Sequence, residues 1–255
     1  HPTTEGPVNR SSSTGFRSHN LDDVAKVFDS EPGNVMVPNP GLKPEYARNF
    51  EIGLIRSFPG KAVFEINGFY TRLKDAMVRR DFTLNGQDSL MYDGTMSKVE
   101  ALVNADAADI YGGSLVLEYW FNDFLRTRHD PTITFGADSD GFPLRHAPPV
   151  FGRSHLIFEN KKWFADLYAD FSGRLTFDNL APSEQEKPYL YATDRNGNPY
   201  SPGWWTLNLK MTYPVHPALT LSGGVENILD KRYRTYSSEI AAPGINFVVS
   251  ATYRF

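Results

Sequence analysis

The sequence holds few residues in an arrangement that could perform catalysis. Serine, histidine and aspartate all occur, but no Gly-x-Ser-x-Gly nucleophile elbow is present, and the absence of cysteine removes thiolate nucleophiles and thiolate metal sites. Two stretches, "DSDG" at 138–141 and "TDRNGNP" at 193–199, carry side-chain oxygens that could hold calcium. Pro199 stands where the glycine of an EF-hand belongs, so turn formation by Asp and Asn is the preferred interpretation. We therefore expect no catalytic residue and no bound metal.

A second kind of chemistry open to the sequence is anion recognition. Arg79 and Arg80 are adjacent in "AMVRRD", near the end of a long segment of alternating character that begins at about residue 62. Guanidinium groups bind carboxylates through paired hydrogen bonds, so these two residues are candidate ligand-binding residues. Ordinary solvated charges on an extended strand are the alternative, which we prefer on the sequence alone.

Composition excludes several classes of protein. The formal net charge is -4 and the charges are dispersed, which argues against a nucleic-acid partner. Mean hydropathy is -0.41, and no apolar stretch reaches the roughly 18 residues of a membrane helix. Strands of a membrane barrel remain possible, because only alternate residues need to be apolar. The first residues, "HPTTEGPVNR", lack the apolar segment of a signal peptide, so we expect a lost leader or a chain that begins inside a longer protein.

Apolar and polar residues alternate with a period of two along most of the chain. In "WTLNLKMTY", for example, Trp205, Leu207 and Leu209 take one face, while Thr206 and Asn208 take the other. No comparable helical stripe occurs, so we predict an all-β, antiparallel protein. About nine strands are predicted, near 48–58, 62–83, 108–121, 124–137, 149–160, 163–177, 204–214, 218–229 and 245–255.

The connections between these strands alternate strictly in length. Short turns are predicted at 59–61, 122–123, 160–162 and 214–217, and long loops at 84–107, 138–148, 178–203 and 230–244. All short turns therefore lie at one end of the sheet, as in outer-membrane barrels. Strands of about 11 residues rise roughly 25 Å when tilted, which is the height of the apolar band of an outer-membrane barrel. Aromatic residues gather at the strand ends, where such barrels carry aromatic girdles. We prefer a transmembrane β-barrel of the outer-membrane type, and keep a soluble β-sandwich as the alternative.

The segment "GGVENILDKRYRTYSSEIAAPGINFVVSATYRF" at 223–255 resembles the C-terminal end of TonB-dependent outer-membrane receptors. In that family a strand runs into "ENLFDKRY", and a loop and "PGR" precede a last strand that finishes in Phe. Asn246 follows Ile245 where the family usually has Arg, which is a minor departure from the pattern. The matching residues are Glu226, Asn227, Asp230, Lys231, Tyr233, Pro243, Gly244 and Phe255.

A second block resembles a pair of boxes in the same family. "GFRSHNLDDV" at 15–24 is similar to the "FRAP" box, although Ser18 and His19 replace its Ala and Pro. "VPNPGLKPEYARNFEIGL" at 37–54 is similar to the "NPNLKPE" box that leads into a strand. The resemblance therefore extends from about residue 15 to the last strand.

The family fold is a 22-stranded barrel plugged by a separate N-terminal domain. The resemblance implies that residues 1–47 form an extracellular loop region before the first complete strand, and that 48–255 form the C-terminal part of the barrel. The plug and the TonB-binding box lie outside this sequence. An odd strand number and two open sheet edges favour a part of a larger barrel. The implied partners are the rest of the receptor, the TonB complex, the barrel-assembly machinery and outer-membrane lipid.

The resemblance implies active uptake of a scarce nutrient, an iron compound such as haem or a ferric siderophore, and no enzyme activity. These compounds would be cargo rather than cofactors. Paired boxes of this kind occur in haem receptors, where a histidine in the loop between them binds haem iron. His19 is the histidine between the boxes, and His146 in "LRHAPP" is a second candidate on the same side. A solvated loop histidine is the alternative for each, and a passive porin is the alternative function.

The last strand, "GINFVVSATYRF", places Phe247, Val249, Tyr253 and Phe255 on one face. Aromatic residues suit the membrane interface, and a terminal aromatic resembles the signal that the barrel-assembly machinery reads. Tyr253 and Phe255 are therefore the predicted assembly signal. The resemblance places the protein in the outer membrane with its C-terminus on the periplasmic side.

Overall fold

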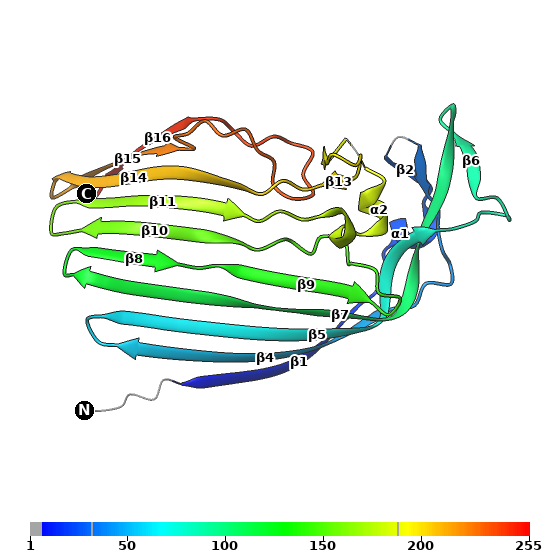
Figure 1. Cartoon of the computed structure of the whole chain (residues 1–255), viewed down its shortest axis with the longest axis horizontal. Coiled ribbons are helices and arrows are strands. Elements are labelled where there is room, and N and C mark those ends of the chain that lie inside the picture. Colours follow the sequence, from blue (N-terminus) through cyan, green and yellow to red (C-terminus); the bar gives the residue numbers. More distant parts are fainter. Residues whose placement is uncertain (1–6, 32, 188) are drawn as a thin grey trace.

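The computed structural model describes residues 7–31, 33–187 and 189–255, and one large antiparallel sheet dominates them (Figure 1). Its hydrogen-bonded strands follow the order β1-β4-β5-β7-β8-β10-β11-β14-β15-β16. These strands are β1 (Val8–Arg17), β4 (Glu45–Phe58), β5 (Ala62–Asp81), β7 (Thr95–Asn122), β8 (Leu125–His129), β10 (Phe151–Glu159), β11 (Phe164–Ser172), β14 (Trp204–His216), β15 (Leu219–Glu226) and β16 (Asn246–Tyr253).

The remaining elements lie mostly at the end of the sheet that carries the long loops (Figure 1). Among the described residues, no helix is both long enough and apolar enough to cross a membrane. These elements are α1 (Leu21–Ala25), β2 (Phe28–Glu31), β3 (Asn34–Met36), β6 (Ser89–Tyr92), β9 (Thr132–Asp138), the 3-10 helix η1 (Phe177–Asn179), α2 (Pro182–Gln185), β12 (Ala192–Thr193) and β13 (Pro199–Tyr200).

The strand register confirms that alternate residues share one face. One hydrogen-bonded row crosses five neighbouring strands and is apolar throughout. The row consists of Leu156, Leu167, Leu209, Val225 and Phe247. Because side chains in one row point to the same side of a sheet, a continuous apolar surface follows, as a lipid-facing wall requires.

The structure corrects the interpretation of residues 1–47 as a loop region. Val8–Arg17 forms β1, which pairs with β4 from Val8 opposite Leu54 to Arg17 opposite Glu45. Ten strands therefore follow one another in the described sheet, and the argument from an odd strand number was wrong. The sequence did not reveal β1, because "VNRSSSTGFR" is largely polar and alternates weakly.

The structure also corrects two strand boundaries. The predicted loop at 84–107 contains β6 and the first half of β7, which begins at Thr95 rather than at 108. The predicted strand at 124–137 divides into β8 and β9 on either side of Asp130 and Pro131. Pro131 has no N–H to give to a strand ladder, which explains the interruption.

The buried apolar core is small and lies in the part of the structure built from the long loops. Val35 and Val37 pack with Val99 and Ala101, where β3 pairs with the extended β7. A second cluster is formed by Ala76, Val78, Ala105 and Ala108 on β5 and β7. The outer faces of the transmembrane strands stay exposed, because lipid rather than protein covers them in a membrane barrel.

A buried carboxylate joins two of the long loops. Glu184 of α2 is 0% exposed, and it accepts hydrogen bonds from the hydroxyls of Tyr191 at 2.9 Å and Tyr236 at 2.7 Å. Burial first, and the charge of Glu184 second, raise the pKa of both tyrosines, so their hydroxyls remain protonated donors. The loop of α2 is thereby held to the loop between β15 and β16.

Candidate functional site

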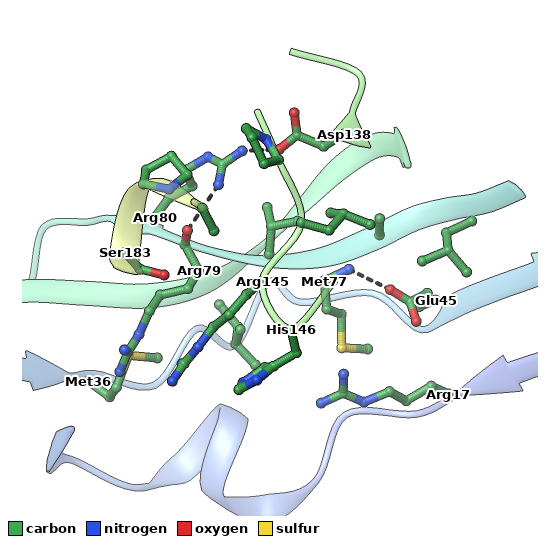
Figure 2. Close-up of a pocket in the computed structure, with 18 of the residues that line it drawn as sticks. Arg17, Met36, Glu45, Met77, Arg79, Arg80, Asp138, Arg145, His146 and Ser183 are labelled. Atoms are coloured by element: carbon green, nitrogen blue, oxygen red, sulfur yellow. Dashed lines mark hydrogen bonds and ion pairs between the residues drawn. The ribbon is translucent and has the colours of Figure 1, made fainter. Parts of the chain in front are cut away.

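A cavity of about 690 Å³ opens at the long-loop end of the sheet. It lies between the end of β1, the upper parts of β5 and β7, the loop after β9 and α2 (Figure 2). Its basic lining residues come from four separate segments and outnumber the three acidic ones, which are Asp29, Glu45 and Asp138. They are Arg17, Arg79, Arg80, Arg145, His146 and Lys187.

Arg79 and Arg80 both line this cavity, but each is held by a carboxylate. They are neighbours on a strand and point to opposite sides of it. The Arg79 guanidinium lies 3.3 Å from Glu100 and contacts the sulfur of Met36, in a site where both charged side chains are nearly buried. Arg80 forms an ion pair with Asp138 and lies 4.8 Å over the ring of Phe142. They are therefore not the solvated charges that we preferred from the sequence.

Asp138 organises the turn that follows β9. Its carboxylate accepts hydrogen bonds from the backbone N–H groups of Asp140 at 3.1 Å and Phe142 at 3.0 Å, and Gly141 supplies a positive φ of 86°. The stretch 138–141 is thus a turn built by an aspartate, as expected. Asp194 does the same at 193–199, where it accepts from the N–H groups of Asn196 and Asn198.

His146 lies in the loop after β9 and points into the cavity beside Arg145 (Figure 2). The residue has a positive φ of 63° and keeps contact with solvent. The atoms packed around the ring lower the pKa of His146 below its ordinary value, and the positive charge of Arg145 adds to this effect. The imidazole is therefore neutral at pH 7, which is the form that binds a metal ion.

The structure brings together three of the four ligand-binding candidates from the sequence. Arg79, Arg80 and His146 line one cavity, whereas His19 is absent from the lining. Arg17, Arg145 and Lys187 also line the cavity and were not predicted from the sequence. Two of them had an available signal, since Arg145 precedes His146 and Arg17 lies in the same box as His19. Lys187 had none, because α2 reaches the cavity only through tertiary packing.

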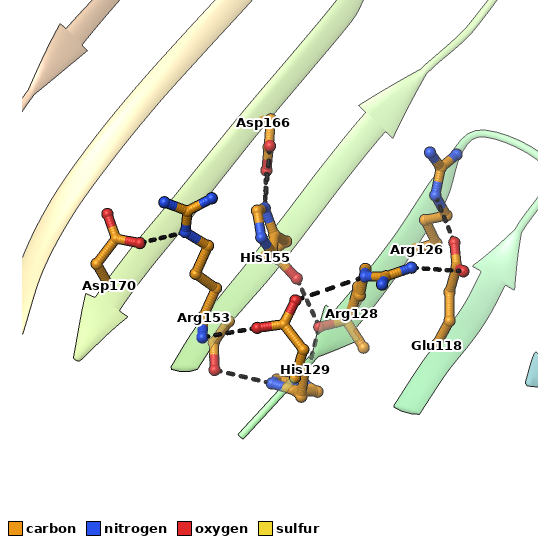
Figure 3. Close-up of polar contacts among 11 residues, drawn as sticks. Glu118, Arg126, Arg128, His129, Arg153, His155, Asp166 and Asp170 are labelled. Carbon is orange, nitrogen blue, oxygen red and sulfur yellow. Dashed lines mark hydrogen bonds and ion pairs between the residues drawn. The ribbon is translucent and has the colours of Figure 1, made fainter. Parts of the chain in front are cut away.

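Below the cavity, charged side chains cover the inner face of the sheet (Figure 3). Arg126 lies 2.9 Å from Glu118 and 2.7 Å from Glu159, and Arg153 pairs with Asp170. This ladder of ion pairs spans β7, β8, β10 and β11, so the inner face is polar where the outer face is apolar, as in a barrel wall.

The two strand histidines lie on opposite faces of this wall. His155 is on the inner face, where its Nδ1 atom lies 3.0 Å from the carboxylate of Asp166. His129 pairs with Ser154 and therefore shares the outer face with Leu156.

The C-terminus, which follows β16, lies at the end of the sheet that carries the short turns (Figure 1). Tyr253 is the last residue of β16 and pairs with Leu219, and Phe255 follows it fully exposed. Their role in assembly stays a prediction.

The amino-acid sequence matches the family described as "TonB dependent receptor-like, beta-barrel" over residues 11–228. The chain belongs to this family. Among curated proteins, this receptor barrel is 25% identical to the hemoglobin-haptoglobin utilization protein B of Neisseria meningitidis, over 89% of the chain and 30% of the relative. It is 26% identical to a probable hemoglobin and hemoglobin-haptoglobin-binding protein 4 of Haemophilus influenzae, over 89% of the chain and 23% of the relative.

Solved structures of similar shape also belong to receptors and transporters. The copper transporter OprC matches with a TM-score of 0.72 and 20% identity, over 100% of this chain and 38% of OprC. A mutant of the ferric enterobactin receptor PfeA of Pseudomonas aeruginosa, in complex with enterobactin, matches with a TM-score of 0.73 and 18% identity, over 99% and 39%. At these identities the likeness shows the fold. The receptor barrel described here spans less than a third of the length of the curated relatives that it matches.

Proposed function

We propose that this chain is the C-terminal part of an outer-membrane receptor that takes up an iron compound with energy supplied through TonB. The observation that carries the proposal is the cationic cavity at the long-loop end, where Arg145 and His146 project inward above a polar barrel wall. A cavity of this charge attracts carboxylate-bearing cargo. Membership of the TonB-dependent receptor family supports a transport role.

Haem is the cargo that we propose. Haem carries two propionates and an iron atom, so it can use both the guanidinium group of Arg145 and the neutral imidazole of His146. The curated relatives support this choice, since both are named for haemoglobin and its haptoglobin complex. A ferric siderophore would use the cations but would leave the imidazole without a role.

The proposed orientation follows from the loops. Long loops are extracellular in outer-membrane barrels and short turns are periplasmic, so the proposal puts the cavity outside the cell and Tyr253 on the periplasmic side. The proposed partners are the rest of the receptor with its plug, the TonB complex, and the assembly machinery that inserts the barrel. Both outer edges of the described sheet, β1 and β16, need further strands in lipid.

The test uses the full-length receptor in a strain that lacks its own haem and siderophore receptors. Growth is measured with haem, haemoglobin or a ferric siderophore as the sole iron source. We expect growth on haem or haemoglobin that requires TonB, and an at least roughly tenfold loss of haem affinity in a double variant, Arg145→Gln with His146→Asn. Asparagine is chosen because it tolerates a positive φ.

The matched control is Arg195→Gln, an exposed arginine at the same end of the sheet that does not line the cavity. It should leave haem affinity unchanged. Growth on the siderophore alone would replace haem as the cargo, and uptake that persists without TonB would contradict the receptor proposal in favour of a passive pore.

A further inference from the structure

Three cations gather on the outer face of the sheet near the long-loop end of β4 and β5. Arg48 lies directly opposite Arg72, and Lys74 lies opposite Tyr46. These residues share the face of Ile52, because residues two apart on a strand point to the same side. All three line a hollow of about 810 Å³, in which Asp106 is the single acidic lining residue.

The charges of this cluster are only partly neutralised within the protein. Arg72 lies 3.0 Å from the carboxylate of Asp109. This carboxylate also accepts a hydrogen bond of 2.6 Å from the hydroxyl of Tyr70. Within residues 7–31, 33–187 and 189–255, neither Arg48 nor Lys74 has a carboxylate partner. Like charges directly opposite each other on a sheet are destabilising, so Arg48 beside Arg72 favours a bound anion.

A row of aromatic side chains lies directly below these cations. The strand register joins them across β4, β5, β7 and β9, and all four are exposed. The row consists of Phe50, Tyr70, Tyr111 and Phe135. Exposed aromatic residues of a membrane protein mark the level of the lipid headgroups, so the cations lie at headgroup height or just above it.

Below the aromatic row the outer face is grooved. Gly68 and Gly113 are directly paired on β5 and β7, and with no side chains there the wall sinks between its apolar neighbours. The groove measures about 740 Å³, and its lining includes Ile52, Ile66 and Ile133. Gly68 precedes Arg72 by four residues, which is about 13 Å along a strand.

We propose that this outer face binds a phosphate-bearing lipid of the membrane leaflet at the long-loop end. Its phosphates contact Arg48, Arg72 and Lys74, and one acyl chain fills the groove over Gly68 and Gly113. The cations match the charge of a phosphorylated headgroup, and the groove below matches its chain, so the two features select one amphipathic molecule. The inference goes beyond cargo uptake and rests only on the position of the barrel in a membrane.

The experiment uses the full-length receptor, purified in a neutral detergent, with diphosphorylated lipid A as the probe. Bound lipid is counted by native mass spectrometry across a titration. We expect the double variant Arg48→Gln with Lys74→Gln to bind the probe at least about tenfold more weakly than the parent receptor. Lipid A without phosphates should bind the parent receptor as weakly as the probe binds this variant.

The matched control removes two charges from the opposite end of the same hairpin. Arg56→Gln with Lys61→Gln should bind within about twofold of the parent receptor, because both residues lie near the short turn. Equal affinity of the parent and the Arg48/Lys74 variant would overturn the proposal. Displacement of the probe by inorganic phosphate at equal concentration would also overturn it, because it would assign the site to a free anion.

A third variant tests the groove. A Cβ atom at Gly68 would meet only ordinary contacts, Ile52 at 3.8 Å and the carbonyl of Gly112 at 3.9 Å, so a side chain can start there without a clash at its first atom. Gly68→Leu is therefore chosen to fill the groove. We expect it to weaken lipid binding while the barrel stays folded, as judged by its heat-dependent shift on an SDS gel. Unchanged binding would contradict the acyl-chain part of the proposal. Cargo uptake is not measured, so the result does not depend on which cargo is transported.

Discussion

The ion pair between Arg80 and Asp138 ties the upper end of β5 to the turn that follows β9. Asp138 is 6% exposed and uses its second oxygen for two backbone N–H groups, so one carboxylate shapes the turn and also holds the strand to it. The loop that carries Arg145 and His146 starts at this turn. The position of Arg145 and His146 therefore depends on Asp138, whose charge is already paired with Arg80.

The first prediction concerns this pair. Asp138→Ala leaves the Arg80 guanidinium and two backbone donors without their acceptor, which costs about 1–3 kcal/mol of unfolding free energy. Urea unfolding of the full-length receptor in lipid vesicles would measure this loss, and limited proteolysis should show new cleavage within 139–150. Asp140→Ala, an exposed neighbour in the same turn, is the control and should resemble the parent receptor. Equal proteolysis of both variants would contradict the role of Asp138.

The second prediction concerns pH. The pKa of His146 is lowered, so the folded loop binds this proton more weakly than the unfolded chain does. The folded loop is therefore most stable above about pH 6.5, the ordinary pKa of histidine. Its stability relative to the unfolded loop falls as the pH drops from there towards the lowered pKa of His146. Proteolysis of the loop should become faster over that range.

His146→Asn is the matched variant for this measurement, because Asn tolerates the positive φ of 63° and does not titrate. Its cleavage rate should stay level from pH 7 down to the range where carboxylates begin to titrate. A parent receptor whose cleavage rate is as level as that of the variant would show that His146 does not control the loop.

The third prediction concerns the carboxylate that joins two long loops. Glu184→Ala removes the acceptor for the hydroxyls of buried Tyr191 and half-buried Tyr236, at a cost of about 1–3 kcal/mol of unfolding free energy. Hydrogen exchange should accelerate in both 178–203 and 227–245, because the two loops lose their common anchor. Glu239→Gln, in the second of these loops but exposed, should leave exchange as it is. Acceleration confined to the loop of α2 would count against a shared anchor.

The fourth prediction concerns assembly. Deleting Phe255 from the full-length receptor should lower the amount of folded barrel in the outer membrane, because the exposed aromatic after β16 is the proposed assembly signal. Surface labelling and the heat-dependent shift on an SDS gel would measure the folded amount. Lys61→Gln, in a short turn at the same end, controls for position. Normal levels of the deletion variant would remove Phe255 from this role.

Local alternation predicted much of the fold. The shared face of Trp205, Leu207 and Leu209 was predicted because a strand places every second residue on one face, and that property needs no knowledge of a partner strand. The row that joins Leu209 to Leu167 and Leu156 on the neighbouring strands required the register that the structure shows. The separation of short and long connections followed in the same way, since an antiparallel chain reverses at each turn. β1 escaped notice because its polar residues become a strand only through pairing with β4.

The sequence by itself determined the lipid-facing pattern, the ends of the sheet and the presence of Arg79, Arg80 and His146 near one end. Tertiary structure alone decided which of these residues share a cavity, which carboxylate holds each arginine, and that Arg48 lies opposite Arg72 on the outer face. The physical reason is range. Alternation is a property of neighbouring residues, whereas a cavity, an ion pair or a cluster of like charges exists only after segments distant in the chain have been brought into register.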